Sequence, residues 1–244
     1  MKPSQDDHVF ERPRTTGTLL TLFVAALWLA SPRPIQPGFF LIAAAIGGLA
    51  VWLGLAAARR VGTGALILDG TVAAPLAARR LAISIAVGVA SGAVLLAVLV
   101  YLLVPIEPAL ATRLKARIGA PSWLPWALAV ESSILEEFAL RLFLLSSLAW
   151  LLARGWRNVR ATVSPVASWS AITVSSLVFA AVHLPAWLAT TAPSAILIAS
   201  VLTLNGVAGI VLGYLYWRWG IESAVLAHFA ADMVVQGIGS RLVA

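Results

Sequence analysis

The chain has 244 residues, of which 61% are hydrophobic and 11% charged, and its formal net charge is +7. Because roughly a quarter of the residues of a soluble domain are charged, this composition excludes an ordinary soluble protein and indicates an integral membrane protein. The basic residues are scattered in ones and twos through the connecting segments, which argues against a nucleic-acid partner and for contact with anionic membrane lipids. Cysteine is absent, which excludes disulfides and cysteine nucleophiles.

Apolar runs recur along the whole chain, and most are near the ~20 residues that a helix needs to cross the hydrocarbon core. The sequence therefore predicts an all-α, polytopic transmembrane helix bundle of about seven spans, with six to eight as the range. The runs are 18–30, 39–58, 81–104, 124–153, 171–189, 194–217 and 221–240.

The first run is short and follows Arg12 and Arg14, so a signal peptide is an alternative to a first span. Asp6, Asp7 and Glu11 in the same basic segment favour an uncleaved first span. Between the third and fourth runs, segment 105–120 mixes apolar and basic residues, and we expect either a short interfacial helix or a plain connecting loop.

Basic residues outside the spans predict the orientation. Eleven lie on the side that holds the N-terminus and five on the other, so the positive-inside rule predicts a cytoplasmic N-terminus. The Ala- and Arg-rich composition and the short loops are typical of a bacterial inner membrane protein. The first three spans carry no charged residue, which suggests a division into a cytoplasmic tail (1–17), a packing region (18–124) and a catalytic region (125–244).

The fourth run contains Glu136, Glu137 and Arg141, and charged residues within membrane spans are often functional. Glu137 and Arg141 are spaced i, i+4, which predicts a structural ion pair. The two adjacent carboxylates are about 100° apart around a helix, so we expect that they do not face one target and that Glu136 alone faces a site. A purely structural polar cluster of all three residues is an equal alternative.

Two later runs carry two histidines and an aspartate. His183 follows Phe179 by four residues and precedes Pro185, so we expect the helix to end or kink there. Taken alone, a buried structural histidine is the simpler interpretation. His228 and Asp232 lie one helical turn apart on the last run. They could be a carboxylate that orients an imidazole, two ligands of one metal, two groups around one oxygen, or a buried structural pair.

Taken together, the three segments resemble the motifs EExxxR, FxxxH and HxxxN or HxxxD of the CAAX protease and bacteriocin-processing (CPBP, or Abi) family of intramembrane proteases. The resemblance covers about residues 125–240. The chain lacks the HExxH, aspartyl-dyad and GxSxG patterns of other protease classes.

The resemblance implies an intramembrane endopeptidase in which Glu136 and His183 activate the attacking water. His228 and Asp232 would bind the oxyanion or complete a metal site. The best-described members have Asn at the position of Asp232, and an ionised Asp cannot donate a hydrogen bond. Glu136, His183, His228 and Asp232 are also a plausible ligand set for Zn²⁺, so both a glutamate-dependent enzyme and a metalloprotease remain open.

We therefore expect a hydrolase that cleaves a membrane-associated protein or peptide, with membrane lipids as its other partners. In eukaryotic CAAX-processing members, three residues are removed from a prenylated C-terminus; for a bacterial protein, peptide maturation or signalling-protein cleavage is the expectation. The alternative is a membrane protein without enzymatic activity, either a proton or ion pathway or an immunity-type protein that binds a bacteriocin peptide.

Overall fold

The structure, a computed structural model, describes residues 7–32, 34–116, 118–155 and 163–242. These residues form helices and contain no strand, which confirms the predicted all-α bundle. The elements are α1 (Asp7–Ala30), α2 (Pro37–Val61), α3 (Ala74–Ala97), the π-helix η1 (Val98–Leu103), the 3₁₀-helix η2 (Pro108–Ala111), α4 (Thr112–Lys115), α5 (Leu124–Glu137), the π-helix η3 (Phe138–Leu145), α6 (Ser146–Gly155), α7 (Pro165–Leu188), α8 (Ala195–Trp219) and α9 (Ile221–Leu242).

Five helical stretches in the described residues are long and apolar enough to cross a membrane: 37–61, 74–103, 165–188, 195–219 and 221–239. The two other predicted spans correspond to α1 and to the unbroken helix that runs from α5 through η3 to α6. The predicted count of about seven spans therefore agrees with the structure. The first helix begins at Asp7, so residues 7–17 of the expected tail continue that helix, while residues 1–6 lie outside the described part.

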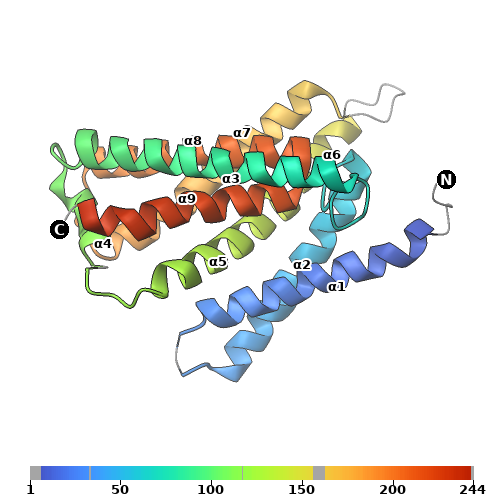
Figure 1. Ribbon diagram of the computed structural model, residues 1–244, viewed down its shortest axis with the longest axis horizontal. Coiled ribbons are helices and arrows are strands. Elements are labelled where there is room, and N and C mark those ends of the chain that lie inside the picture. Colours follow the sequence, from blue (N-terminus) through green and yellow to red (C-terminus); the bar gives the residue numbers. More distant parts are fainter. Residues whose placement is uncertain (1–6, 33, 117, 156–162, 243–244) are drawn as a thin grey trace.

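The helices pack in two groups (Figure 1). Helices α3, α8 and α9 run side by side, and α9 also contacts α5. The α1–α2 hairpin lies to one side of this group and is joined to it through α5, η3 and α6. Helix α9, which carries His228 and Asp232, is therefore surrounded by other helices.

Two glycines of α3 allow this helix to approach α9 very closely. A Cβ atom on Gly88 would lie 2.2 Å from the carbonyl oxygen of Ala227, and one on Gly92 would lie 2.7 Å from that of Ala231. Glycines spaced by four residues are a common device for close helix packing in membranes. The N-terminal half of the chain thus positions the helix that carries His228.

The structure tests two local predictions, the end of the helix at His183 and the form of segment 105–120. The expected helix end at His183 is wrong: α7 continues to Leu188 with Pro185 inside it. Proline lacks its own N–H but keeps its carbonyl, which accepts from the N–H of Ala189 and so closes the last turn. Segment 105–120 contains the short turns η2 and α4, whose Leu110 and Leu114 are buried. This segment therefore closes one end of the bundle.

Candidate active site

The helix that carries Glu136 changes its winding directly after Glu137. Residues 138–145 form the π-helix η3, and π segments inside α-helices occur frequently at functional sites. Neighbouring hydroxyl groups bond to its backbone: Ser175 of α7 donates to the carbonyl oxygen of Leu140 (2.7 Å), and Ser146 donates to that of Arg141 (3.2 Å). The π segment is thereby fixed against α7.

Glu137 and Arg141 form a fully buried ion pair. Arg141 Nη1 lies 3.0 Å from Glu137 Oε1, and both side chains have 0% exposure. Arg141 Nη2 also donates to the carbonyl oxygen of Gly209 on α8 (3.2 Å), and its guanidinium lies 4.4 Å from the ring centre of Phe179. Since a buried charge is costly without partners, these contacts explain how Arg141 exists in the bundle interior.

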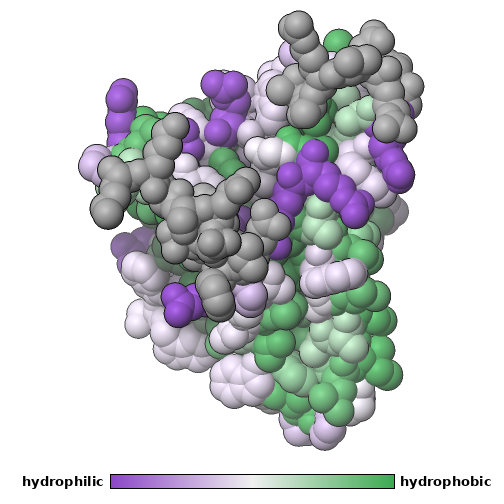
Figure 2. Space-filling view, turned by 90° about the vertical axis from the view of Figure 1, so that its right-hand side faces the viewer, coloured by the Kyte–Doolittle hydropathy of each residue, from purple (hydrophilic) through white to green (hydrophobic). Residues whose placement is uncertain are grey.

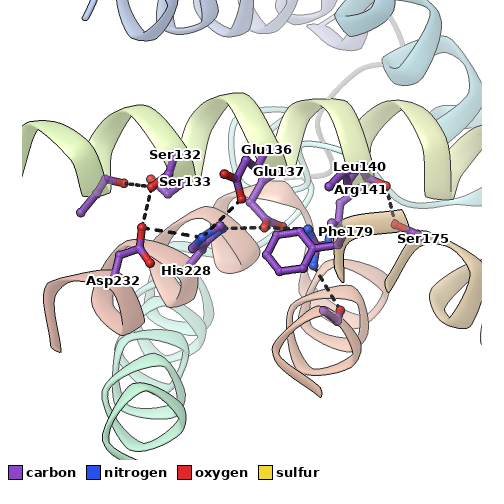
Figure 3. Close-up of polar contacts among 12 residues, drawn as sticks. Ser132, Ser133, Glu136, Glu137, Leu140, Arg141, Ser175, Phe179, His228 and Asp232 are labelled. Carbon is purple, nitrogen blue, oxygen red and sulfur yellow. Dashed lines mark hydrogen bonds and ion pairs between the residues drawn. The ribbon is translucent and has the colours of Figure 1, made fainter. Parts of the chain in front are cut away.

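Glu137 also contacts a second residue, which its i, i+4 spacing from Arg141 did not predict. Its Oε1 lies 2.8 Å from Nδ1 of His228, a contact between α5 and α9 (Figure 3). A carboxylate that pairs with arginine is ionised and only accepts hydrogen bonds, so Nδ1 of His228 is the donor. Glu137, rather than Asp232, thus orients this imidazole and leaves its Nε2 for other contacts.

The expectation that adjacent carboxylates do not face one target is wrong for this pair. Glu136 and Glu137 both approach His228, Glu136 at Nε2 (3.9 Å) and Glu137 at Nδ1 (2.8 Å). The physical reason is that an imidazole presents its two nitrogens on different edges, so two carboxylates that diverge by about 100° can each reach one of them.

His183 is held by its own helix. Its Nδ1 lies 2.7 Å from the carbonyl oxygen of Phe179, and a carbonyl oxygen can only accept, so Nδ1 is again the donor. In the neutral ring, Nε2 of His183 is therefore an acceptor. The ring of Phe179 packs against both imidazoles, with centroids 4.8 Å from His183 and 5.8 Å from His228. One aromatic side chain thus contacts Arg141 and both histidines.

Glu136 faces the Nε2 atoms of both histidines. Its Oε2 is 3.8 Å from Nε2 of His183 and 3.9 Å from Nε2 of His228, and the three residues come from three different helices. Within the described part of the chain, this buried Oε2 atom has no hydrogen-bond partner. The Glu136 side chain is 31% exposed and that of His183 24%, so the group is accessible, unlike the Glu137–Arg141 pair behind it.

Asp232 completes the group from the next turn of α9. Its Oδ2 lies 3.9 Å from Nε2 of His228, which is too long for a direct hydrogen bond. The same oxygen accepts hydrogen bonds from Ser132 (2.5 Å) and from Gln236 (2.9 Å). Sequence reasoning missed Ser132, although it lies one turn before Glu136 and therefore on the same face of α5.

A cavity of about 410 Å³ contains this group. Its walls come from α3, α5, α7, α8, α9 and the segment between η1 and α5, and most of them are apolar. Glu131, which lies one turn before the EExxxR segment, is half-buried and lines it as well, as does Asn205 of α8. The cavity is thus mostly apolar with a small number of polar side chains, as in many ligand sites.

The side chains do not have the spacing of a tetrahedral zinc site. Ligand atoms about 2.0–2.1 Å from a tetrahedral metal lie roughly 3.3–3.4 Å from one another. Here Glu136 lies 3.8 and 3.9 Å from the two imidazole Nε2 atoms, and Asp232 lies 3.9 Å from that of His228. Among the described residues, no group of three or more His, Asp and Glu side chains is close enough to hold a metal ion. The donor types suit zinc, but their separations in this structure are longer than those of a tetrahedral site.

Comparison with known proteins identifies the same part of the chain. The model of the family "Type II CAAX prenyl endopeptidase Rce1-like" matches residues 118–234, a region that contains Glu136, His183, His228 and Asp232. Neither the search of curated proteins nor the search of solved structures gave a match.

Proposed function

We propose that the chain is an intramembrane endopeptidase that uses a glutamate-activated water, because residues 118–234 match the type II CAAX prenyl endopeptidase family, Rce1-like. The substrate would be a membrane-associated protein or peptide whose scissile bond enters the mostly apolar cavity. One observation carries the proposal: Glu136 Oε2 lies 3.8 and 3.9 Å from two imidazole Nε2 atoms supplied by two other helices.

The first step concerns the nucleophile. Glu136 Oε2 and His183 Nε2 are both acceptors, because Nδ1 of His183 already donates to Phe179. A water molecule between them would donate one hydrogen to each and direct a lone pair into the cavity. As the water oxygen attacks the peptide carbonyl carbon, Glu136 takes its proton and later passes it to the leaving nitrogen.

The second step concerns the developing oxyanion. Glu137 fixes the ring of His228 through Nδ1, which directs Nε2 toward the same region as Glu136. When protonated, this Nε2 donates a hydrogen bond to the oxyanion of the tetrahedral intermediate, which then loses the C–N bond. In this proposal, Asp232 lies 3.9 Å from Nε2 of His228 and does not bond to it; its role is to fix the side chains of Ser132 and Gln236 through hydrogen bonds.

A proton or ion pathway fits the polar contacts less well. Beyond the cavity, the buried hydroxyl groups of Ser146, Tyr216 and Thr63 form a second polar cluster, with Ser146 Oγ 2.5 Å from Tyr216 Oη. Arg141 contacts both clusters, because its guanidinium pairs with Glu137 and its carbonyl oxygen accepts from Ser146. A guanidinium keeps its proton in proteins and a backbone carbonyl carries none, so this link does not pass a proton from one cluster to the other. The contacts therefore favour a hydrolase over a relay.

The decisive experiment uses purified protein in lipid nanodiscs and a library of membrane-associated peptides, with products identified by mass spectrometry. We expect Glu136→Gln to lower the cleavage rate by about 10²–10⁴-fold, the contribution of a general base. The matched control is Glu222→Gln, a half-buried carboxylate outside the cavity whose Oε1 accepts from the backbone N–H groups of residues 67 and 68. Identical products from wild type and Glu136→Gln at equal rates would refute the assignment.

A further inference from the structure

Two arginines contact the indole of Trp150 at the end of the bundle that holds the start of α1. Arg154, one turn further along α6, places its guanidinium carbon 4.5 Å from the centre of the indole. Arg60, from the last turn of α2, places its guanidinium carbon 5.0 Å from the same ring. Cation–π contacts of this length are favourable, so the indole keeps two positive charges together that would otherwise separate.

Within the part of the chain that the structure describes, these two charges have no acidic partner. Among the side chains that the structure describes, no carboxylate forms an ion pair with Arg60 or Arg154, and both arginines are exposed. The neighbouring Arg59 differs, because it pairs with Asp69 at 3.3 Å. A guanidinium stacked on an aromatic ring keeps its N–H donors, which match the oxygens of a phosphate. The pair is therefore suited to an anion.

Exposed apolar side chains continue from these arginines toward the middle of the bundle. Leu53 lies two turns before Arg60 on the same face of α2 and is 42% exposed, and Leu49, one turn further, is 56% exposed. On α6, Leu151 precedes Arg154 by three residues and is 54% exposed. Figure 2 views this end of the molecule, where hydrophilic side chains gather above a largely hydrophobic surface. A molecule that fits has an anionic head and apolar chains.

We propose that Arg60, Trp150 and Arg154 form a binding site for the phosphate of an anionic phospholipid, whose acyl chains lie on Leu49, Leu53 and Leu151. Basic pockets between transmembrane helices are known to recognise such headgroups. The site is separate from the candidate active site and does not depend on the proposed protease activity.

The bound lipid would join α2 to α6 where α2 also meets the π segment. A Cβ atom on Gly54 of α2 would lie 2.6 Å from the carbonyl oxygen of Leu142, so the two backbones are in close contact. A ligand that binds both helices stabilises their packing, because it binds only the folded arrangement. We therefore expect phosphatidylglycerol to raise the thermal unfolding temperature of the full chain in detergent, and phosphatidylcholine to leave it unchanged.

The test measures phosphatidylglycerol binding by native mass spectrometry and by thermal unfolding. We expect the double variant Arg60→Gln/Arg154→Gln to bind about thirtyfold more weakly. The control Arg79→Gln/Arg80→Gln removes the same charge from the start of α3, at the same end of the bundle, and should bind as wild type does. Equal weakening in both double variants would mean that only the general surface charge matters, which overturns the proposal.

Two further experiments test whether the indole is needed in addition to the charge of the arginines, and whether the acyl chains are needed in addition to the phosphate. Trp150→Leu keeps both arginines but removes the ring that holds them, so we expect weaker phosphatidylglycerol binding at unchanged net charge. Undiminished binding by this variant would contradict the assigned site. Inorganic phosphate should not raise the unfolding temperature of wild type, and stabilisation equal to that by phosphatidylglycerol would show that no acyl chain is bound.

Discussion

Nδ1 of His228 donates a buried hydrogen bond of 2.8 Å to Oε1 of Glu137. The two residues are 91 positions apart in the chain, and their contact joins α9 to α5. The same carboxylate oxygen lies 3.0 Å from Nη1 of Arg141. Glu137 therefore has two functions in the fold: it neutralises a buried guanidinium, and it fixes the imidazole that approaches Glu136.

The first prediction concerns this shared carboxylate. Glu137→Ala should lower the free energy of unfolding by roughly 3–5 kcal/mol, because Arg141 would remain buried without its charge partner. The measurement is thermal or denaturant unfolding of the purified protein in detergent. Arg141→Met tests the reverse case, in which Glu137 remains charged and buried. If either single variant is as stable as wild type, the ion pair does not hold the π segment in place.

The second prediction concerns Asp232. Asp232→Asn should retain most of the activity, because an amide oxygen can still accept from Ser132 and Gln236. Asp232→Leu should lose about tenfold or more, since it removes a hydrogen-bond partner for two polar side chains. The measurement compares the cleavage rates of both variants with that of wild type on one peptide. A strong loss in Asp232→Asn would show that the negative charge itself is required.

The third prediction concerns metal. Because the separations of 3.8 and 3.9 Å exceed those of a tetrahedral zinc site, we expect cleavage to survive dialysis against a chelator. The chelator-treated protein is then assayed with and without added Zn²⁺, and its metal content is measured by mass spectrometry. Loss of activity that returns with stoichiometric Zn²⁺ would instead identify a metalloprotease.

The fourth prediction concerns the contact of α3 with α9. Gly88→Ala places a methyl group about 2.2 Å from the carbonyl oxygen of Ala227, one residue before His228, so the helices must separate. We expect a loss of about 1–3 kcal/mol in stability, as for other overpacked sites, together with lower activity. Gly206→Ala in α8 is the control, because its added methyl would only reach ordinary contact at 3.9 Å from Ala180. Equal stability of the two variants would contradict the tight packing.

The features that depend on a single helix could be predicted from the sequence. The length of its apolar runs indicated the membrane spans, and the i, i+4 spacing placed Glu137 beside Arg141 and Asp232 beside His228. The three motifs also indicated the family whose model matches residues 118–234. These properties are local, because the pitch of a helix fixes which residues share a face.

The tertiary structure decided the contacts between helices. It brings Glu136 close to Nε2 of both histidines. It also forms the hydrogen bond between Glu137 and His228 and the one from Ser132 to Asp232. Helical periodicity says which face a residue occupies but not which residue of another helix lies at the same depth. That relative depth follows from close packing, such as the approach of Gly88 to Ala227, and from the buried polar groups that must find partners.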